Sequence, residues 1–468
     1  MSDSDSMTAS AEAPSKPFNW RFTTPLYIGS ALNPINSSLI ATALVPIAAG
    51  VHVSIGQTAA LVSALYLASA IAQPTAGKAA EVFGPRRVFL AGILLVLAGG
   101  MVGGLAPGLP ALIISRVLIG LGTSCAYPTA MVLIRRRARA AGLAKPPGAV
   151  LGGLMIAGVA TASLGLPIGG VLVQFLAWRS VFLINVPVAL IALIATGMWV
   201  PRDHATERRT ARRIASDLDL TGIVGFALAM TSLLLCLSGL PTPNWALLAA
   251  TAVAWALEIW WELRAKSPFF DVRLLGRNAA LTRTLIRFGL VMLCGYVVLY
   301  GVTQWLEASQ GMTAVGAGLL LIPMTVVSGV VIVPFSRRNL VRGPIIAAAV
   351  ACIAAAISAL FLPTPAWLAV TLVVTGLLGF AQGAASNNQL ALYSQVTAEQ
   401  LGTASGLMRS FGYLGSIASS AVTGIVYRTS VTDTGVVTIA WIMVGCSLVL
   451  LGISILDRAL GRTAAPTI

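Results

Sequence analysis

The sequence predicts an all-α membrane protein with 14 transmembrane helices in a six-plus-two-plus-six arrangement. Of its 468 residues 57% are hydrophobic and only 10% are charged, against about 25% charged in soluble domains. A soluble protein of this composition would expose large apolar patches. Apolar stretches long enough to cross a bilayer, which takes about 20 residues, recur along the chain, and basic residues gather in alternate loops.

Polar or Pro/Gly clusters separate the apolar stretches and set the predicted boundaries. The predicted spans are 24–49, 57–76, 87–107, 109–134, 147–174 and 180–200, then 220–240 and 245–263, then 280–303, 313–335, 343–362, 366–389, 403–427 and 435–456. The expected domains are a disordered cytoplasmic tail (1–23), an N-terminal six-helix bundle (24–200), a basic linker with two inserted helices (201–279), a C-terminal six-helix bundle (280–456) and a second cytoplasmic tail (457–468).

The loop charges predict the topology. Basic clusters follow the even-numbered spans, as at Arg86 and Arg87, whereas the opposite loops hold only Arg179 and Arg428. Loops rich in Lys and Arg stay in the cytoplasm. Both termini are therefore expected in the cytoplasm of a multi-pass protein of the cell inner (plasma) membrane. The polar first segment does not have the pattern of a signal peptide.

Several function classes are disfavoured. The net charge of +15 lies in short loops, so a nucleic-acid surface is not expected. The five cysteines fall in apolar stretches without CxxC spacing, and His52 and His204 lie in predicted loops, so neither a metal nor another cofactor is expected. The predicted spans offer no histidine and no acidic pair, which disfavours an intramembrane enzyme. A monomer in the lipid bilayer is expected.

A faint internal echo suggests two similar halves. The loop from Gly77 to Arg87 resembles the segment from Pro334 to Gly343, and the Gly120/Gly122 pair resembles a later glycine pair in span 12. Parallel repeats of this kind occur in transporters whose substrate site lies between the halves near the midplane.

Residues 77–87 read GKAAEVFGPRR. This resembles the loop pattern between spans 2 and 3 of the major facilitator superfamily, with matches at Gly77, Glu81, Gly84, Arg86 and Arg87. The resemblance implies the major facilitator fold. A carboxylate beside a helix N-terminus and nearby arginines would form a charge latch that breaks and re-forms as the halves rock.

Two spans carry further family patterns. RVLIGLG in span 4 places Arg116 inside the bilayer, where an arginine is costly and indicates a functional site; the alternative is a structural arginine bonded to helix-end carbonyls. GLPIGGVL in span 5 resembles an antiporter pattern with a displaced proline, and its residues imply a pliable gate or close packing alone. These residues are Gly165, Pro167, Gly169 and Gly170.

Three stretches are similar to the fourteen-span drug:proton antiporter branch of the family. They are WRSVFLINVP at 178–187, SPFFDVRLLGRN at 267–278 and QGMTAVGAGLLLIP at 310–323. The sequence departs from the branch in span 1, where Asn36 occupies the usual acidic position. Asparagine does not exchange a proton in the physiological range, which puts proton coupling through this span in doubt.

The remaining charges predict a selectivity. Only Glu258 and Glu307 are expected to touch the membrane region, whereas Arg116 and Arg409 are expected near the cavity. Such a cavity should prefer neutral or anionic amphiphiles to cations. Arg283 and Arg287 are interpreted as reaching lipid headgroups. The polar residues expected to line the cavity, each of which could instead make a helix-packing hydrogen bond, are Asn33, Asn36, Tyr127, Tyr296, Tyr300, Gln304, Gln382, Asn387 and Asn388.

These observations predict a secondary transporter that exports a small amphiphilic molecule by alternating access, with protons as the coupling ion. Two alternatives remain open. One is uptake or facilitated transport of a neutral or anionic solute without protons, and the other is a receptor or scaffold that transports nothing.

Overall fold

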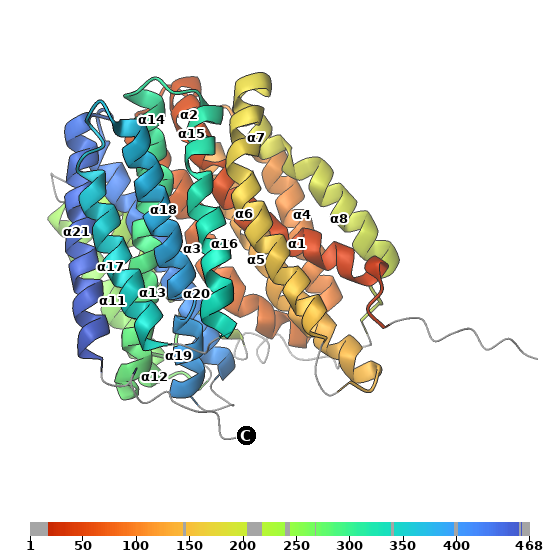
Figure 1. The fold of residues 1–468 in the computed structure, drawn as a ribbon. Helices are drawn as coiled ribbons and strands as arrows, with labels where there is room; N and C mark the ends of the chain where they lie inside the picture. The colour runs from red at the N-terminus through yellow and green to blue at the C-terminus, as the bar shows by residue number, and fades with distance from the viewer. Residues whose placement is uncertain are drawn as a thin grey trace, which may run out of the picture.

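The computed structural model describes residues 17–143, 147–203, 218–238, 244–266, 268–337, 341–396, 401–457 and 460. Every regular element within these ranges is helical. This confirms the all-α fold class, and the helices form two bundles with an inserted pair between them in the sequence (Figure 1).

The N-terminal bundle contains six long helices, of which the first is interrupted after Leu39. Its elements are α1 (Trp20–Leu39), η1 (Ala41–Ala43), α2 (Leu44–Gly50), α3 (Ile55–Phe83), α4 (Pro85–Gly104), α5 (Leu109–Ala140), α6 (Gly148–Leu176), α7 (Ser180–Leu183) and α8 (Asn185–Trp199). The break after Leu39 leaves the last carbonyls of α1 without partners inside the helix.

The inserted pair consists of α10 (Leu220–Ser238) and α11 (Trp245–Glu262), followed by the short α12 (Val272–Arg277). Helix α10 packs against both α3 and α20. The pair is therefore in contact with both bundles, along the seam where α3 meets α20.

The C-terminal bundle repeats the plan of the first. Its elements are α13 (Ala279–Val297), the π-helix η2 (Val298–Val302), α14 (Thr303–Ala308), α15 (Ala314–Leu320), α16 (Ile322–Arg337), α17 (Arg342–Ala359), α18 (Trp367–Ala385), α19 (Asn388–Gln395), α20 (Leu401–Val426) and α21 (Asp433–Leu456). Predicted span 9 thus continues through η2 as far as Ala308.

Twelve helical segments in the described ranges are long and apolar enough to cross a membrane, two fewer than the sequence predicts. Predicted spans 8 and 13 do form helices, α11 with 18 residues and α20 with 26, but neither is among the twelve. Two glutamates in α11 and many serines and glycines in α20 lower their apolarity. Both helices nevertheless pack against neighbouring spans.

The bundle has two distinct ends. At one end α3 passes into α4 through Gly84, and α12 and α19 lie there too (Figure 1); we call it the basic end because Arg86, Arg136 and Arg137 lie there. The other end carries α2, α7, α14 and α15 (Figure 1). Helices α6 and α16 lie close together toward that end and separate toward the basic end (Figure 1).

Candidate functional site

A cavity of about 240 Å³ lies between the two bundles in the part nearer the basic end. Helices α3 and α5 supply one wall and α20 supplies the other. The lining residues are Gln73, Pro74, Gly77, Tyr127, Pro128, Ser405, Gly406 and Arg409. Three of them, Gly77, Tyr127 and Arg409, are residues that the sequence singled out.

Arg409 is the only charged residue among the described residues that line this cavity. Its guanidinium carbon lies 4.1 Å from the centre of the Tyr127 ring, so a cation–π contact joins α20 to α5 across the cavity. Such contacts contribute about 0.5–1 kcal/mol at exposed sites. The described cavity wall is therefore positive at Arg409 and otherwise uncharged.

Four tyrosines close the cavity toward the opposite end. Tyr66 of α3 packs against Tyr296 and Tyr413 of the other bundle, with ring centres 5.1 and 5.8 Å apart. The Tyr413 hydroxyl donates to the side-chain oxygen of Gln73, which lines the cavity. The hydroxyl of Tyr300 donates to the Ser37 carbonyl (3.0 Å) and lies 2.9 Å from the hydroxyl of Tyr66. Since Tyr300 has one proton to give, Tyr66 is the donor in the second bond.

Beyond the tyrosines, the two bundles meet backbone to backbone. A Cβ on Gly170 of α6 would lie 2.6 Å from the Val315 Cα and 2.7 Å from the Ala314 oxygen. Gly318 of α15 would make a similar contact of 2.8 Å with the Leu166 oxygen. The predicted gate glycine Gly170 thus lies on the contact between the bundles. The structure is closed at this end, while its cavity lies nearer the basic end.

The end of α1 contacts both Arg116, which the sequence places inside the bilayer, and Tyr300, one of the tyrosines that close the cavity. Arg116 of α5 donates to the carbonyl of Asn36 through both terminal nitrogens (3.3 Å each) and to the Leu61 carbonyl through Nε (3.2 Å). Arg116 and Tyr300 therefore satisfy two adjacent carbonyls in the last turn of α1. A positive charge is favourable at this end of a helix because the helix dipole is negative there.

The side chains of the predicted span 1 residues point into the N-terminal bundle. Asn36 and Asn185 exchange two amide hydrogen bonds of 2.7 and 3.0 Å and are both buried. Asn33 donates to the hydroxyls of Thr123 (2.9 Å), Ser69 (3.2 Å) and Ser124 (3.4 Å). Neither asparagine is among the residues that line the cavity.

The remaining predicted residues are spread over the structure. Gln382 faces Gly295, and Gln304 is buried with its side-chain oxygen lacking a hydrogen-bond partner among the described residues. Asn387 bonds the Ala384 carbonyl within its own turn (3.0 Å). Gly165 and Gly169, on either side of Pro167, lie against the α1 segment that contains Ser38 and Leu39.

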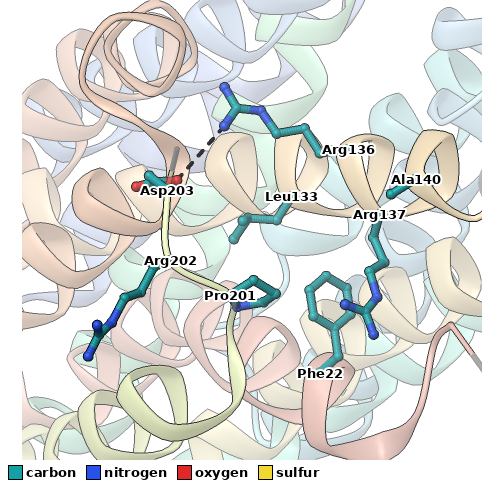
Figure 2. Close-up of a pocket in the computed structure, with 8 residues that line it drawn as sticks. All are labelled: Phe22, Leu133, Arg136, Arg137, Ala140, Pro201, Arg202 and Asp203. Carbon is teal, nitrogen blue, oxygen red and sulfur yellow. Dashed lines mark ion pairs between the residues drawn. The ribbon is translucent and has the colours of Figure 1, made fainter. Parts of the chain in front are cut away.

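At the basic end, the structure places an acid that the sequence analysis did not name beside the predicted latch arginines. Asp203, four residues beyond the end of α8, accepts the backbone N–H groups of Arg86 (3.2 Å) and Arg87 (3.0 Å) at the start of α4. Figure 2 shows its ion pair with Arg136, which measures 3.8 Å. The side chain of the predicted acid, Glu81, lies outside the described residues. Gly84, with φ at +96°, makes the turn that brings this helix start to the carboxylate.

Asp203 borders a second cavity of about 260 Å³ at the basic end of the N-terminal bundle (Figure 2). Arg137 bonds the Pro17 carbonyl there (2.8 Å) and lies over the Phe22 ring. Sequence reasoning missed Asp203 because its partners lie more than 60 residues away in the chain. The available signal was its position, as the first acid after the last span of the N-terminal half.

The expected set of acids in the membrane region was incomplete. Besides Glu258, the carboxylates of Glu262, Asp219 and Asp457 are almost fully buried, at 1, 5 and 1% exposure. All three lie at helix ends, where neighbouring segments cover them. Arg287 is also fully buried and bonds Asp457 at 2.6 Å, so it does not reach the lipid headgroups as interpreted from the sequence.

Comparison with known proteins identifies the family. The model of the Major Facilitator Superfamily matches residues 26–420. An uncharacterized MFS-type transporter of Bacillus subtilis, YwoD, is 30% identical over 88% of this chain and 91% of its own length. The tetracenomycin C resistance and export protein of Streptomyces glaucescens is 29% identical over 88% of this chain and 77% of its own length. The multidrug resistance protein Stp of Mycobacterium tuberculosis is 29% identical over 78% of this chain and 68% of its own length.

Solved structures agree on the fold. The peptide transporter POT superposes with a TM-score of 0.67 at 15% identity, covering 94% of this chain and 95% of that chain. The nucleoside transporter NupG gives a TM-score of 0.62 at 15% identity, covering 95% of this chain and 100% of that chain. The chain belongs to the major facilitator superfamily, and it is a multi-pass membrane transporter of small molecules rather than an enzyme.

Proposed function

We propose that this transporter exports a small neutral or anionic amphiphile across the plasma membrane, driven by protons that move in the opposite direction. The observation that carries the proposal is the cavity between the bundles. Arg409 supplies its only charge among the described lining residues, and Tyr127 offers an aromatic face beside that charge. An anionic or neutral aromatic compound suits such a wall better than a cation does.

The direction of transport rests on two supports. Lys and Arg are abundant in the loops of the basic end, and such loops stay in the cytoplasm. With both termini inside, the cavity nearer the basic end takes substrate from the cytoplasm. The relatives named for tetracenomycin C export and multidrug resistance favour export over uptake.

We further propose that α11 and α20 cross the membrane and that the chain is a fourteen-span antiporter. The support is their length and their packing against the spans α10, α3 and α13. The inserted pair α10 and α11 then follows the layout of the fourteen-span branch that the sequence resembles.

Transport into everted membrane vesicles tests the proposal. The panel contains cationic, neutral and anionic amphiphiles, with and without nigericin, which collapses the pH gradient. We expect accumulation of neutral and anionic compounds that nigericin abolishes. Accumulation of cations alone would overturn the selectivity, and accumulation that nigericin leaves unchanged would overturn proton coupling. Release from preloaded vesicles in place of accumulation would indicate uptake.

A matched pair of arginine variants tests the cavity itself. Arg409→Gln removes the charge over Tyr127, whereas Arg179→Gln removes a similar cation–π contact of 4.2 Å with Trp178, away from the cavity. We expect Arg409→Gln alone to lower transport of anionic compounds while leaving transport of neutral ones. Equal effects of both variants on both classes would contradict the assignment of this cavity as the binding site.

A further inference from the structure

Two glutamates of the inserted pair lie buried together, outside the cavity between the bundles. Glu258 and Glu262 are one helical turn apart on α11, so they share a face. Their exposed fractions are 5 and 1%. Two carboxylates at this spacing repel each other when both are ionised.

The hydrogen bonding of the pair is incomplete. Oε1 of Glu262 accepts the backbone N–H of Phe270 at 3.1 Å. Oε2 of Glu262 and Oε1 of Glu258 are buried without a hydrogen-bond partner among the described residues. An ionised carboxylate in this position would be an uncompensated buried charge. Because the two residues share one face of α11 a single turn apart, a proton held between their carboxyl groups removes one charge and supplies the missing donor.

Helix α10 is shaped to receive the pair. A Cβ on Gly222 would lie 2.7 Å from Oε1 of Glu262, and a Cβ on Gly225 would overlap Oε2 of Glu258. Glycines one turn apart on α10 therefore leave room for one carboxyl group each. The third nearby acid, Asp219, is already satisfied, because it accepts from Gly222 N (3.2 Å), Trp261 Nε1 (2.9 Å) and Phe269 N (2.9 Å).

The charged groups around the pair are few. Asp219 at the start of α10 raises the negative potential, and Lys78 of α3 lies close enough to Glu262 to offset it. Arg264 stacks on Trp260 (4.2 Å), and Arg273 of α12 donates to the Ala265 carbonyl (2.7 Å).

The pair is joined to both bundles. Lys78 belongs to α3 of the N-terminal bundle. Phe270, whose N–H is held by Glu262, stacks on Phe226 of α10 (5.8 Å) and on Phe411 of α20 (6.0 Å). Protonation weakens Glu262 as an acceptor for Phe270 and removes its attraction to Lys78. Lys78 thus connects the pair to the N-terminal bundle, and Phe270 connects it to the C-terminal bundle through Phe411.

We propose that Glu258 and Glu262 form a proton-binding site that holds one proton between two carboxyl groups, and that this site couples transport to protons in place of the acid missing at Asn36. The binding of the proton stands independently of the transport direction. Only the coupling role rests on the proposed proton antiport.

Infrared difference spectroscopy of the purified full chain in lipid, titrated with pH, detects the proton directly. We expect a carboxylic-acid C=O band that shifts in D₂O and disappears in both Glu258→Gln and Glu262→Gln. The same band should persist in Glu307→Gln, which removes another buried glutamate outside the pair. Gly225→Ala, which displaces Glu258 without removing a carboxylate, should shift or abolish the band even if the glutamine variants fold poorly. A band that survives the three changes at Glu258, Glu262 and Gly225, or one that disappears in Glu307→Gln, would overturn the site.

Vesicle transport then tests the coupling role. The amide of Glu258→Gln always offers an N–H donor to Glu262, so this variant mimics the protonated pair. We expect Glu258→Gln to keep exchange of substrate across the membrane at equal pH while losing its response to nigericin. If wild-type transport responds to nigericin and Glu258→Gln responds equally, the coupling role is wrong. If wild-type transport ignores nigericin, the proposed antiport is wrong, and the infrared result still decides the proton site.

Discussion

Among the described residues, each half of the transporter contains one fully buried arginine, and the two are neutralised in different ways. Arg287 in the C-terminal half bonds the Asp457 carboxylate at 2.6 Å, with Thr284 (2.7 Å) and Asn388 (3.4 Å) completing the set. Arg116 in the N-terminal half bonds only the carbonyls of Leu61 and Asn36 among the described residues.

The different partners, a carboxylate for Arg287 and carbonyls for Arg116, predict different roles for the two arginines. Arg287 and Asp457 form a closed ion pair, which joins α13 to the end of α21 and fixes the C-terminal bundle. The charge of Arg116 faces the negative end of the interrupted helix α1 and has no carboxylate partner in the described structure. Asn36 offers Arg116 its backbone carbonyl, while its side chain bonds Asn185. We therefore expect changes at Arg287 to affect stability and changes at Arg116 to affect transport.

The largest effect is expected for Asp457→Asn. This change leaves the Arg287 charge buried without its counter-ion, which costs about 3–5 kcal/mol of folding free energy. Thermal unfolding in detergent, followed by tryptophan fluorescence, measures it. Arg283→Gln is the control, since Arg283 is 39% exposed and contacts the same carboxylate, and exposed pairs contribute about 0–1 kcal/mol. Equal melting of Asp457→Asn and the wild type would break the comparison.

Arg116→Gln should reduce the folding stability less than Asp457→Asn does, and it should reduce transport more. The change leaves two buried carbonyls short of a donor, a loss of about 1–3 kcal/mol, and it removes the charge. Arg116→Lys keeps the charge but not the planar fork that reaches both carbonyls. We expect uptake into everted vesicles to fall at least about tenfold for Gln, the ratio that 1.4 kcal/mol represents, with Lys intermediate. Wild-type transport by Arg116→Gln would make the arginine purely structural.

Gly170→Ala tests the contact between the halves where neither arginine acts. The added Cβ would meet backbone atoms of Ala314 and Val315 at 2.6–2.7 Å, and overpacking of this kind costs about 1–3 kcal/mol. The contact between α6 and α15 is made only in the observed state, so Gly170→Ala should lower the population of that state. The readout is alkylation of Gly77→Cys in a cysteine-free background, which should slow from the basic side. Gly376→Ala, with open space around it, should leave the rate unchanged.

The sequence predicts the fold well because hydropathy and loop charge are local properties. The breaks in the helices were not predicted, because the end of α1 at Leu39 and the π-helix Val298–Val302 lie inside continuous apolar stretches. Which face of a helix meets the cavity depends on distant partners. Asn33 and Asn36 therefore face the bundle interior, while Gly77, Tyr127 and Arg409 line the cavity. Gly170 was predicted as a gate residue by resemblance, but its partner in α15 was not.

The acids of the two halves sharpen the same comparison and explain why sequence reasoning missed them. Asp203 lies four residues beyond α8, the last helix of the N-terminal half, and Asp457 directly follows α21, the last helix of the C-terminal half. They hold different partners. Asp457 is sealed between two arginines at 2.6 and 2.8 Å, whereas Asp203 binds two backbone N–H groups and a half-exposed Arg136 at 3.8 Å. The N-terminal acid is the one that can release its partners.

Asp203→Asn should therefore have the smallest effect. The amide oxygen can still accept one N–H at the start of α4, so the loss is limited to charge, about 0.3–1 kcal/mol at a helix N-terminus. Melting should change little compared with Asp457→Asn. Transport should fall because the contact between Asp203 and the start of α4 is weakened. Adding Arg136→Gln should lower transport no further if both residues act through one contact. Additive transport losses in the double variant would show that Asp203 acts through the α4 N-terminus alone. A loss of thermal stability as large as that of Asp457→Asn would show that the two acids have the same structural role.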